Sequence, residues 1–356
     1  MTGDAAVDRM GGRDVAQGIA WQAEHAARND APITARICFA LLAVMQGDTA
    51  TGRRISTWPG AVIEDALPLR LAAAFHHLHL TGAEARLTPV YTGAITDQAA
   101  VDAAVLAVAR DHDAALLRWL DGPPQTNEAG RSASFIAALA WLSGRIGPRF
   151  EMNELGASAG CNSMIERYRY ELGGVGFGPA GSPVRIAPEW RGPPPPAAEV
   201  TITAISGCDR APIDLADRAQ ALRLKSYIWP EQPFRLERLD RIIALAQASP
   251  PRLVRADADA WVPARLAAPQ PAGVTRVFYH SIVWQYLAPE ARARIEAALR
   301  DAGARASAQR PLAWVMLETN RATFRHELRV RHWPGPADWT LLGEAQAHGA
   351  WVEWRG

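Results

Sequence analysis

The chain has few cysteines and almost no net charge. Its three cysteines among 356 residues, Cys38, Cys161 and Cys208, lack the paired spacing of zinc or iron–sulfur ligands and fit reduced thiols. The formal net charge is +1, without a run of lysine or arginine, so we expect neither nucleic acid nor an anionic membrane surface as a partner.

Long apolar runs are also missing. No stretch approaches the roughly 18 residues that a membrane span needs, and residues 1–14 do not resemble a signal peptide. We therefore expect a soluble, cytoplasmic protein.

The composition is that of a folded protein, and the chain is long enough for more than one hydrophobic core. Hydrophobic residues make up 49% and charged residues 21% of the chain, as in ordinary globular proteins. Single cores stop growing at roughly 250 to 300 residues, so the length predicts two domains. Apolar residues recur at helical spacing up to about Leu120, which predicts an N-terminal helical lobe at 1–122 and an α/β domain at 123–356. The histidines within 75–79 fit packing better than metal binding, because adjacent helical residues point in different directions.

From residue 149 onward, strand-like segments alternate with helical ones, which predicts a parallel sheet covered on both faces. The expected strands are 149–155, 199–205, 252–255, 275–279 and 312–317. Two more, 327–333 and 351–354, are expected to close the sheet, joined by a helix around 341–347. We therefore predict a Rossmann-like, mixed sheet of seven strands.

The segment 154–160, Glu-Leu-Gly-Ala-Ser-Ala-Gly, stands between the first expected strand and a following helix. Gly156, Gly160 and the small residues between them would let backbone N–H groups and the helix N-terminus approach a polar ligand. Glu154 is placed to engage a charged amino-acid group of that ligand or its waters. Ser158 replaces the middle glycine of the dinucleotide fingerprint, so a nicotinamide-dependent oxidoreductase fits less well.

Residues 156–160 also match the nucleophile elbow Gly-x-Ser-x-Gly, which would make Ser158 the nucleophile of a serine hydrolase. Such an elbow normally follows several strands, whereas everything before residue 149 is predicted to be helical. Glu154 also fits the elbow poorly. We therefore favour a cofactor loop and keep the hydrolase as the alternative.

Two acidic residues follow the next strands. Asp209 follows the second strand, where its carboxylate can accept hydrogen bonds from ribose hydroxyls, and Asp257 follows the third, where it can meet an exocyclic adenine amine. Ligands of open α/β sheets bind at this carboxyl edge. A turn or cap role explains each acid equally well.

Four segments together resemble a bacterial family of unknown function: Gln-Thr-Asn-Glu at 125–128, the 154–160 segment, Tyr-Arg-Tyr at 168–170 and His-Ser-x-x-Trp-Gln-Tyr at 280–286. The resemblance extends from about Trp21 to the C-terminus. The architecture resembles the class I S-adenosylmethionine-dependent methyltransferases, whose sheet closes with an antiparallel strand pair. The resemblance implies S-adenosylmethionine as the cofactor. Its implied contacts are Glu154, Gly156, Ser158 and Gly160 at the first motif, with Asp209 and Asp257 at the second and third.

Polar and aromatic residues emerge where a substrate would meet the cofactor. His280, after the fourth strand, is the expected general base, since its unperturbed pKa is about 6.5. Glu318, after the fifth strand, is the second catalytic candidate and is expected to orient the substrate. The expected substrate contacts are Asn127, Glu128, Arg131 and Tyr286. The segment 125–131 fits either a cover over the site or an interlobe hinge.

Methyl transfer from a sulfonium depends mainly on positioning, so the lack of an obvious acid–base pair does not count against it. The sequence therefore predicts an S-adenosylmethionine-dependent methyltransferase acting on an unknown small molecule. A serine hydrolase and a non-catalytic nucleotide-binding Rossmann protein are the alternatives.

Overall fold

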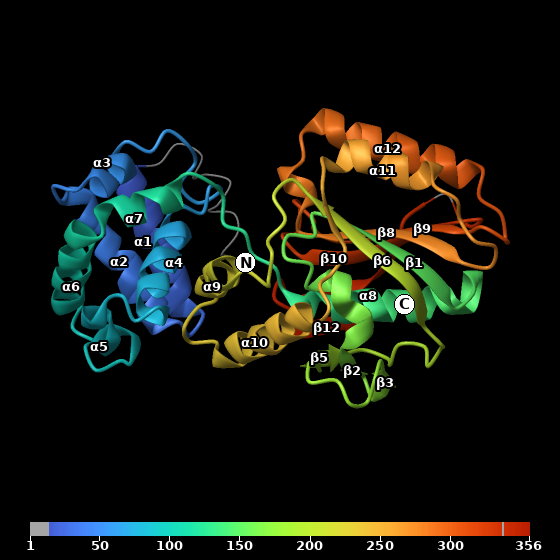
Figure 1. Cartoon of the computed structure of the whole chain (residues 1–356), viewed down its shortest axis with the longest axis horizontal. Helices are drawn as coiled ribbons and strands as arrows, with labels where there is room; N and C mark the ends of the chain where they lie inside the picture. The colour runs from blue at the N-terminus through green and yellow to red at the C-terminus, as the bar shows by residue number, and fades with distance from the viewer. Residues whose placement is uncertain (1–13, 337) are drawn as a thin grey trace. The chain divides into compact units, whose positions relative to one another are not determined.

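The structure, a computed structural model, describes residues 14–336 and 338–356 (Figure 1). The chain folds into two units, each with its own hydrophobic core. One unit comprises the chain up to Thr126 together with Asp217–Leu239, and the other comprises Asn127–Ala216 and Asp240–Gly356. The first unit thus extends past the predicted boundary between residues 122 and 123, to Thr126, and it also includes the segment 217–239.

In the described part of the first unit, called the helical unit below, every regular element is a helix. Its α-helices are α1 (Val15–Arg28), α2 (Pro32–Gln46), α3 (Ala50–Ser56), α4 (Leu67–Leu80), α5 (Thr88–Tyr91), α6 (Gln98–Asp111), α7 (Asp113–Leu117), α9 (Arg218–Ser226) and the first part of α10 (Pro233–Ala248). Asp97 caps α6, since its carboxylate accepts the N–H of Ala100 at 3.0 Å. Apolar side chains on one face of each helix, such as Leu71 and Phe75 of α4, are fully buried in the core that these helices form together.

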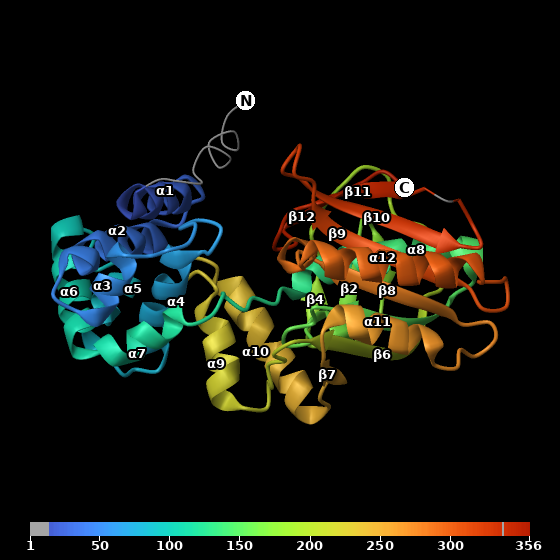
Figure 2. The ribbon, with the colours of Figure 1, turned by 90° about the horizontal axis from the view of Figure 1, so that it is seen from above.

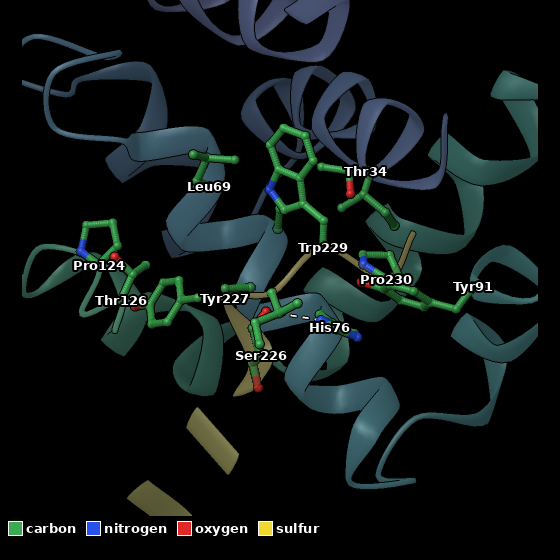
Figure 3. A pocket seen from close by; sticks show the side chains of 14 residues that line it. Thr34, Leu69, His76, Tyr91, Pro124, Thr126, Ser226, Tyr227, Trp229 and Pro230 are labelled. Atoms are coloured by element: carbon green, nitrogen blue, oxygen red, sulfur yellow. Dashed lines mark hydrogen bonds between the residues drawn. The ribbon is translucent and has the colours of Figure 1, made fainter. Parts of the chain in front are cut away.

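A cavity of about 60 Å³ lies within the helical unit, where residues 226–230 meet α2 and α4 (Figure 3). His76 of α4 donates its Nδ1–H to the carbonyl oxygen of Ser226 at 3.0 Å and stacks on Tyr91. The histidine thus serves packing. Among the described residues, no group of three or more His, Cys, Asp and Glu side chains could hold a metal ion.

Within the described ranges, no single helix is both long and apolar enough to cross a membrane. Helices α2 and α3 pass that test only as a pair, with a bend of 99° between them.

The second unit, called the α/β unit, is built on a mixed sheet of nine strands in the order β5-β12-β11-β10-β9-β8-β1-β6-β7 (Figures 1 and 2). These strands are β1 (Arg149–Leu155), β5 (Glu189–Arg191), β6 (Thr201–Asp209), β7 (Leu253–Arg255), β8 (Thr275–Ser281), β9 (Leu312–Thr319), β10 (His326–Trp333), β11 (Thr340–Ala345) and β12 (Trp351–Trp354). Strands β7, β6, β1, β8 and β9 are parallel, and β10, β11 and β12 continue the sheet as an antiparallel run. A separate small sheet contains β2 (Arg169–Leu172), β3 (Val175–Phe177) and β4 (Arg185–Ile186).

Helices cover both faces of the large sheet. Helix α8 (Ser132–Ile146) lies on one face, and α11 (Ala258–Ala267) and α12 (Pro289–Ala304) lie on the other (Figures 1 and 2). Tyr279 of β8 meets Phe135 of α8 edge to face, with ring centroids 5.0 Å apart. The neighbouring Phe278 belongs to the core beneath α11 and α12. Successive side chains of β8 therefore reach opposite layers, as the strand period requires.

The parallel strands and the closing strands 327–333 and 351–354 form where the sequence predicts them, but three details of the prediction are wrong. The sheet has nine strands instead of seven, because β11 and the short β5, paired with β12, are added. Residues 341–347 are not helical, since most of them form β11 and pair with β10. The segment 154–160 leads into a 3₁₀ stretch, Asn162–Arg167, instead of an α-helix.

Candidate functional site

The parallel strands of the α/β unit all end at the same edge of the sheet, and β1 lies at the point where later strands are added on opposite sides. From β1 the sheet extends through β6 and β7 on one side and through β8 and β9 on the other. Ligands of open α/β sheets bind outside the carboxyl ends of the strands at such a switch point. The loops after β1, β8 and β9 therefore form the candidate site.

Each of these three loops holds a non-glycine residue with a left-handed backbone. Ser158, Ile282 and Phe324 have φ angles of 52°, 51° and 57°, and they follow β1, β8 and β9. Such conformations cost about 1–3 kcal/mol each and cluster at functional sites. Ile282 is β-branched, for which a positive φ is a clear outlier. Backbone strain is thus concentrated at this edge.

Glu154 lies near the end of β1, and its carboxyl group is buried. Ser163 donates its hydroxyl hydrogen to Glu154 Oε2 at 2.5 Å, and the Tyr279 hydroxyl lies 3.4 Å from the same oxygen. Burial raises the pKa of Glu154 to about 8, although these two hydrogen bonds act in the lowering direction. Near neutral pH the group is therefore mainly a protonated carboxyl. A positive charge placed beside it would lower its pKa and favour the carboxylate.

The two loop glycines are needed for close packing within the protein. A Cβ atom on Gly156, at a φ of 66°, would lie 2.3 Å from Cγ2 of Val283. A Cβ atom on Gly160, at a φ of 74°, would lie 2.8 Å from Cγ of Pro251. The space in front of Gly156 is thus filled by a side chain from the loop after β8. The predicted close approach of a ligand to the backbone does not take place at Gly156 in this arrangement.

Two buried polar side chains of the same loop have no partner among the residues that the structure describes. They are Ser158, through its Oγ, and Asn162, through both Oδ1 and Nδ2. Asn162 is fully buried, and Ser158 is 8% exposed. A buried donor or acceptor without a partner costs about 1–3 kcal/mol. A polar ligand that supplied both donors and acceptors would remove this cost.

Asp209, predicted to bind ribose, holds the loop after β1. Its Oδ2 accepts the backbone N–H of Ser158 at 2.9 Å, and its Oδ1 accepts that of Ala211 at 2.8 Å. The carboxylate thereby joins the end of β6 to the loop after β1. A carboxylate oxygen can accept more than one hydrogen bond, so this role still allows ligand contact.

The polar segment before α8, predicted to contact substrate, is attached to the same loops. Asn127 Oδ1 accepts the backbone N–H of Cys161 at 2.7 Å. Arg131 is buried, donates from Nε to the carbonyl oxygen of Ala347 at 2.8 Å, and places Nη1 3.4 Å from the Ser281 hydroxyl. Asn127 therefore joins this segment to the loop after β1, and Arg131 joins it to the end of β8 and to the turn between β11 and β12.

Three other predicted residues have different surroundings. Glu128 is buried and accepts the N–H of Gly130 at 2.9 Å, which starts the 3₁₀ turn before α8. Asp257 precedes α11 and is exposed, with an ion pair to Arg210 at 3.2 Å. Tyr286 is 67% exposed. The structure thus gives Glu128 a capping bond and leaves Asp257 and Tyr286 at the surface.

The two catalytic candidates, His280 and Glu318, are in direct contact. His280 is fully buried and donates its Nδ1–H to Glu318 Oε1 at 2.7 Å, while its Nε2 accepts the indole N–H of Trp314 at 3.0 Å. Glu318 Oε1 also accepts the backbone N–H groups of Val283 and Trp284, at 3.1 and 3.3 Å. No ring nitrogen of His280 is open to a substrate in this arrangement. His280 thus has no free ring nitrogen for the general-base role that the sequence predicts, and its Nδ1–H holds Glu318 Oε1.

The family model described as "Uncharacterized protein conserved in bacteria (DUF2332)" matches residues 16–354. The chain belongs to this family. The predicted relationship to a bacterial family of unknown function is thus confirmed, and it includes both the helical and the α/β unit of this DUF2332 protein. No curated protein and no solved structure matches the chain.

The sequence reasoning found only part of a second group of site residues in this DUF2332 chain. Trp284 and Glu318 were expected near a substrate, but Trp314 and Trp339, which line a cavity of about 300 Å³ in the α/β unit with them, were missed. Asn162, described above, was also missed. A count of 13 tryptophans was the available signal for an aromatic cavity, but their positions along the chain do not reveal which rings meet.

Proposed function

We propose that this protein is an S-adenosylmethionine-dependent methyltransferase that acts on a small molecule, with the cofactor at the edge formed by β1, β6 and β8. The observation that carries the proposal is the pair of buried, unpartnered side chains Ser158 and Asn162 in the loop that follows Glu154. Their position at the switch point of the parallel strands supports it, as does the antiparallel run that completes the sheet.

The side chains at this edge fit such a cofactor chemically. Asn162 offers one donor group and one acceptor, and Ser158 offers a hydroxyl that can do either. When bound, S-adenosylmethionine supplies an electrophilic methyl group on a positively charged sulfur. Glu154 becomes a carboxylate beside a positive charge, because the charge stabilises the ionised form. Methyl transfer itself requires mainly that the protein position the acceptor and exclude water.

Isothermal titration calorimetry with S-adenosylmethionine and S-adenosylhomocysteine tests the proposal. Both should bind, and Asn162→Leu and Ser158→Ala should each weaken binding by about tenfold or more, the effect of losing one buried hydrogen bond. Ser134→Ala is a matched control, because Ser134 is another buried, unpartnered hydroxyl but lies on α8. If neither compound binds the wild-type protein, the cofactor assignment is wrong.

Proton release provides a second readout at Glu154. The raised pKa of about 8 means that the apo protein holds this proton at pH 7. Binding of S-adenosylmethionine should therefore release up to one proton, seen as a dependence of the binding enthalpy on the ionisation enthalpy of the buffer. Glu154→Gln should bind without that dependence.

A serine hydrolase is the second candidate, because Ser158 lies in a Gly-x-Ser-x-Gly turn with a left-handed backbone. Its hydroxyl has no hydrogen-bond partner in the described part of the chain, so no described base activates it. Fluorophosphonate labelling that disappears in Ser158→Ala would favour this candidate. A non-catalytic nucleotide-binding protein would bind the cofactor as proposed but methylate none of a panel of small molecules.

A further inference from the structure

Three indole rings form part of the lining of the cavity of about 300 Å³ in the α/β unit, together with three glutamates and Arg329. The ring of Trp314 lies 5.5 Å from that of Trp284 at an interplanar angle of 57°, and 4.7 Å from that of Trp339 at 62°. The rings are therefore inclined to one another, so their faces do not form one flat stack. Inclined aromatic walls of this kind suit a compact group that touches more than one ring face.

His280 holds two of these rings in place from within the core. It accepts the indole N–H of Trp314 and stacks on Trp284, with ring centroids 5.0 Å apart and an interplanar angle of 16°. Because Nε2 acts as an acceptor, the ring is neutral, with its one proton on Nδ1. The walls are thus preorganised by a neutral histidine that brings no positive charge to the cavity.

Glu318 places a carboxylate in the cavity lining, and among the described residues it forms no ion pair with a lysine or arginine. All three of its hydrogen-bond donors, the His280 ring and two backbone N–H groups, point to Oε1. Glu327, another lining residue, is paired with Arg329, which also lines the cavity, so this arginine is neutralised by Glu327 and not by Glu318. The Glu318 side chain is only 11% exposed, so its charge is poorly screened by water.

We propose that this cavity binds a small organic cation, a quaternary ammonium or protonated amine, between the indole faces and Glu318 Oε2. The cation would neutralise a mostly buried carboxylate and gain cation–π attraction from the rings. One ring of the set already has a cation nearby, since the Arg331 guanidinium lies 5.1 Å from the Trp339 centroid. The proposal rests on the cavity alone and does not require methyl transfer.

Titration of the full-length protein with choline and tetramethylammonium, followed by tryptophan fluorescence and calorimetry, tests the proposal. The neutral isostere of choline, 3,3-dimethylbutan-1-ol, has the same shape without the charge. We expect saturable binding of both cations, with the isostere at least about tenfold weaker, because cation–π and charge attraction are lost. No binding of either cation, or equal binding of the isostere, would overturn the proposal.

Two variants locate the binding in the cavity. Glu318→Gln keeps an acceptor for the three N–H donors but removes the charge, and Trp339→Leu removes a half-buried wall. Each should weaken choline binding by about tenfold or more, whereas the matched variants Glu353→Gln and Trp351→Leu, on β12, should bind normally. Unchanged binding in either cavity variant, with an unchanged melting temperature, contradicts the proposal. S-adenosylmethionine is absent from these titrations, so their outcome is independent of the proposed function.

Discussion

His76 in the helical unit and Asn162 in the α/β unit are both buried, with exposures of 3% and 0%. His76 donates to the Ser226 carbonyl oxygen, and burial lowers its pKa to about 4, so it is a neutral packing group. Asn162 pairs through neither side-chain atom with any described residue. Because burial of an unpaired polar group costs free energy, the comparison contrasts a buried polar side chain that is used for packing with one that lies at the edge where we propose a ligand.

The two units also differ in where their strained backbone residues lie. In the helical unit, the left-handed non-glycine residues Asp30 and Ala66 lie at helix ends, where the chain changes direction. In the α/β unit, Ser158, Ile282 and Phe324 all follow strands that end at one sheet edge. Left-handed residues in the helical unit thus accompany chain reversals, whereas those of the α/β unit mark the proposed binding edge.

The largest effect should come from removing a buried ring from each core. Phe75→Ala and Phe278→Ala delete fully buried side chains, and each should lower the free energy of unfolding by about 3–5 kcal/mol. Differential scanning calorimetry should show the Phe75→Ala loss in a transition that S-adenosylmethionine does not shift. The Phe278→Ala loss should occur in the transition that the cofactor does shift. A single transition common to both variants would show that the units unfold together.

The next largest effect distinguishes the buried side chains of His76 and Asn162 directly. His76→Leu leaves the Ser226 carbonyl oxygen without its donor and should cost about 1–3 kcal/mol. Asn162→Leu removes two unpaired atoms and should change stability by less than about 1 kcal/mol. Urea denaturation followed by circular dichroism measures both. An equal loss at the two positions would remove the distinction.

The units should also respond to pH with opposite signs. The pKa of Glu154 is raised from 4.5 to about 8, so its contribution to stability is full below pH 4.5 and is lost as the pH rises to about 8. The pKa of His76 is lowered from 6.5 to about 4, so its contribution is full above pH 6.5 and is lost as the pH falls to about 4. Each slope is at most about 1.4 kcal/mol per pH unit.

Two variants test these slopes in denaturation curves measured from pH 4 to pH 9. Glu154→Gln should flatten the first slope and His76→Leu the second, whereas Glu199→Gln, at an exposed carboxylate, should change neither. If Glu154→Gln has the wild-type slope between pH 5 and pH 8, Glu154 is already ionised in the folded protein.

The smallest effect concerns the strained residues. Ala66→Gly and Ser158→Gly each relieve a left-handed backbone and should stabilise the protein by up to about 1 kcal/mol, seen as a higher melting temperature. Only Ser158→Gly should weaken binding of S-adenosylmethionine in calorimetry, because it also removes a hydroxyl at the proposed site. Normal binding by Ser158→Gly would mean that this hydroxyl does not contact the cofactor.

The strands were predictable where the sequence carries its own local pattern. β1 and β12 match their predicted bounds, and β6, β7, β8, β9 and β10 match to within a few residues. β11 was not predictable, because Leu341, Leu342, Glu344 and Ala345 favour helices on their own and become a strand by pairing with β10. Pairing partners far apart in sequence thus override local propensity.

The sequence indicates which residues follow neighbouring strands, but not their contacts. The 154–160 segment and His280 were expected after the first and fourth strands, and both lie at the carboxyl edge of the sheet. The sequence could not show that Val283 fills the space at Gly156, or that Trp314 and Glu318 occupy both ring nitrogens of His280. Such contacts depend on three strands whose order is set only by the fold.

The segment 217–239 completes the helical unit, although it follows β6 in the chain. During synthesis, the ribosome therefore releases β1 to β6 before the last piece of the first unit. Until then, His76 lacks the Ser226 carbonyl, and Trp119 lacks its edge contact with Tyr227. N-terminal domains generally fold first as units while the chain is made. Here the N-terminal helices cannot complete their core until much of the sheet has been translated, and part of that core stays uncovered until then.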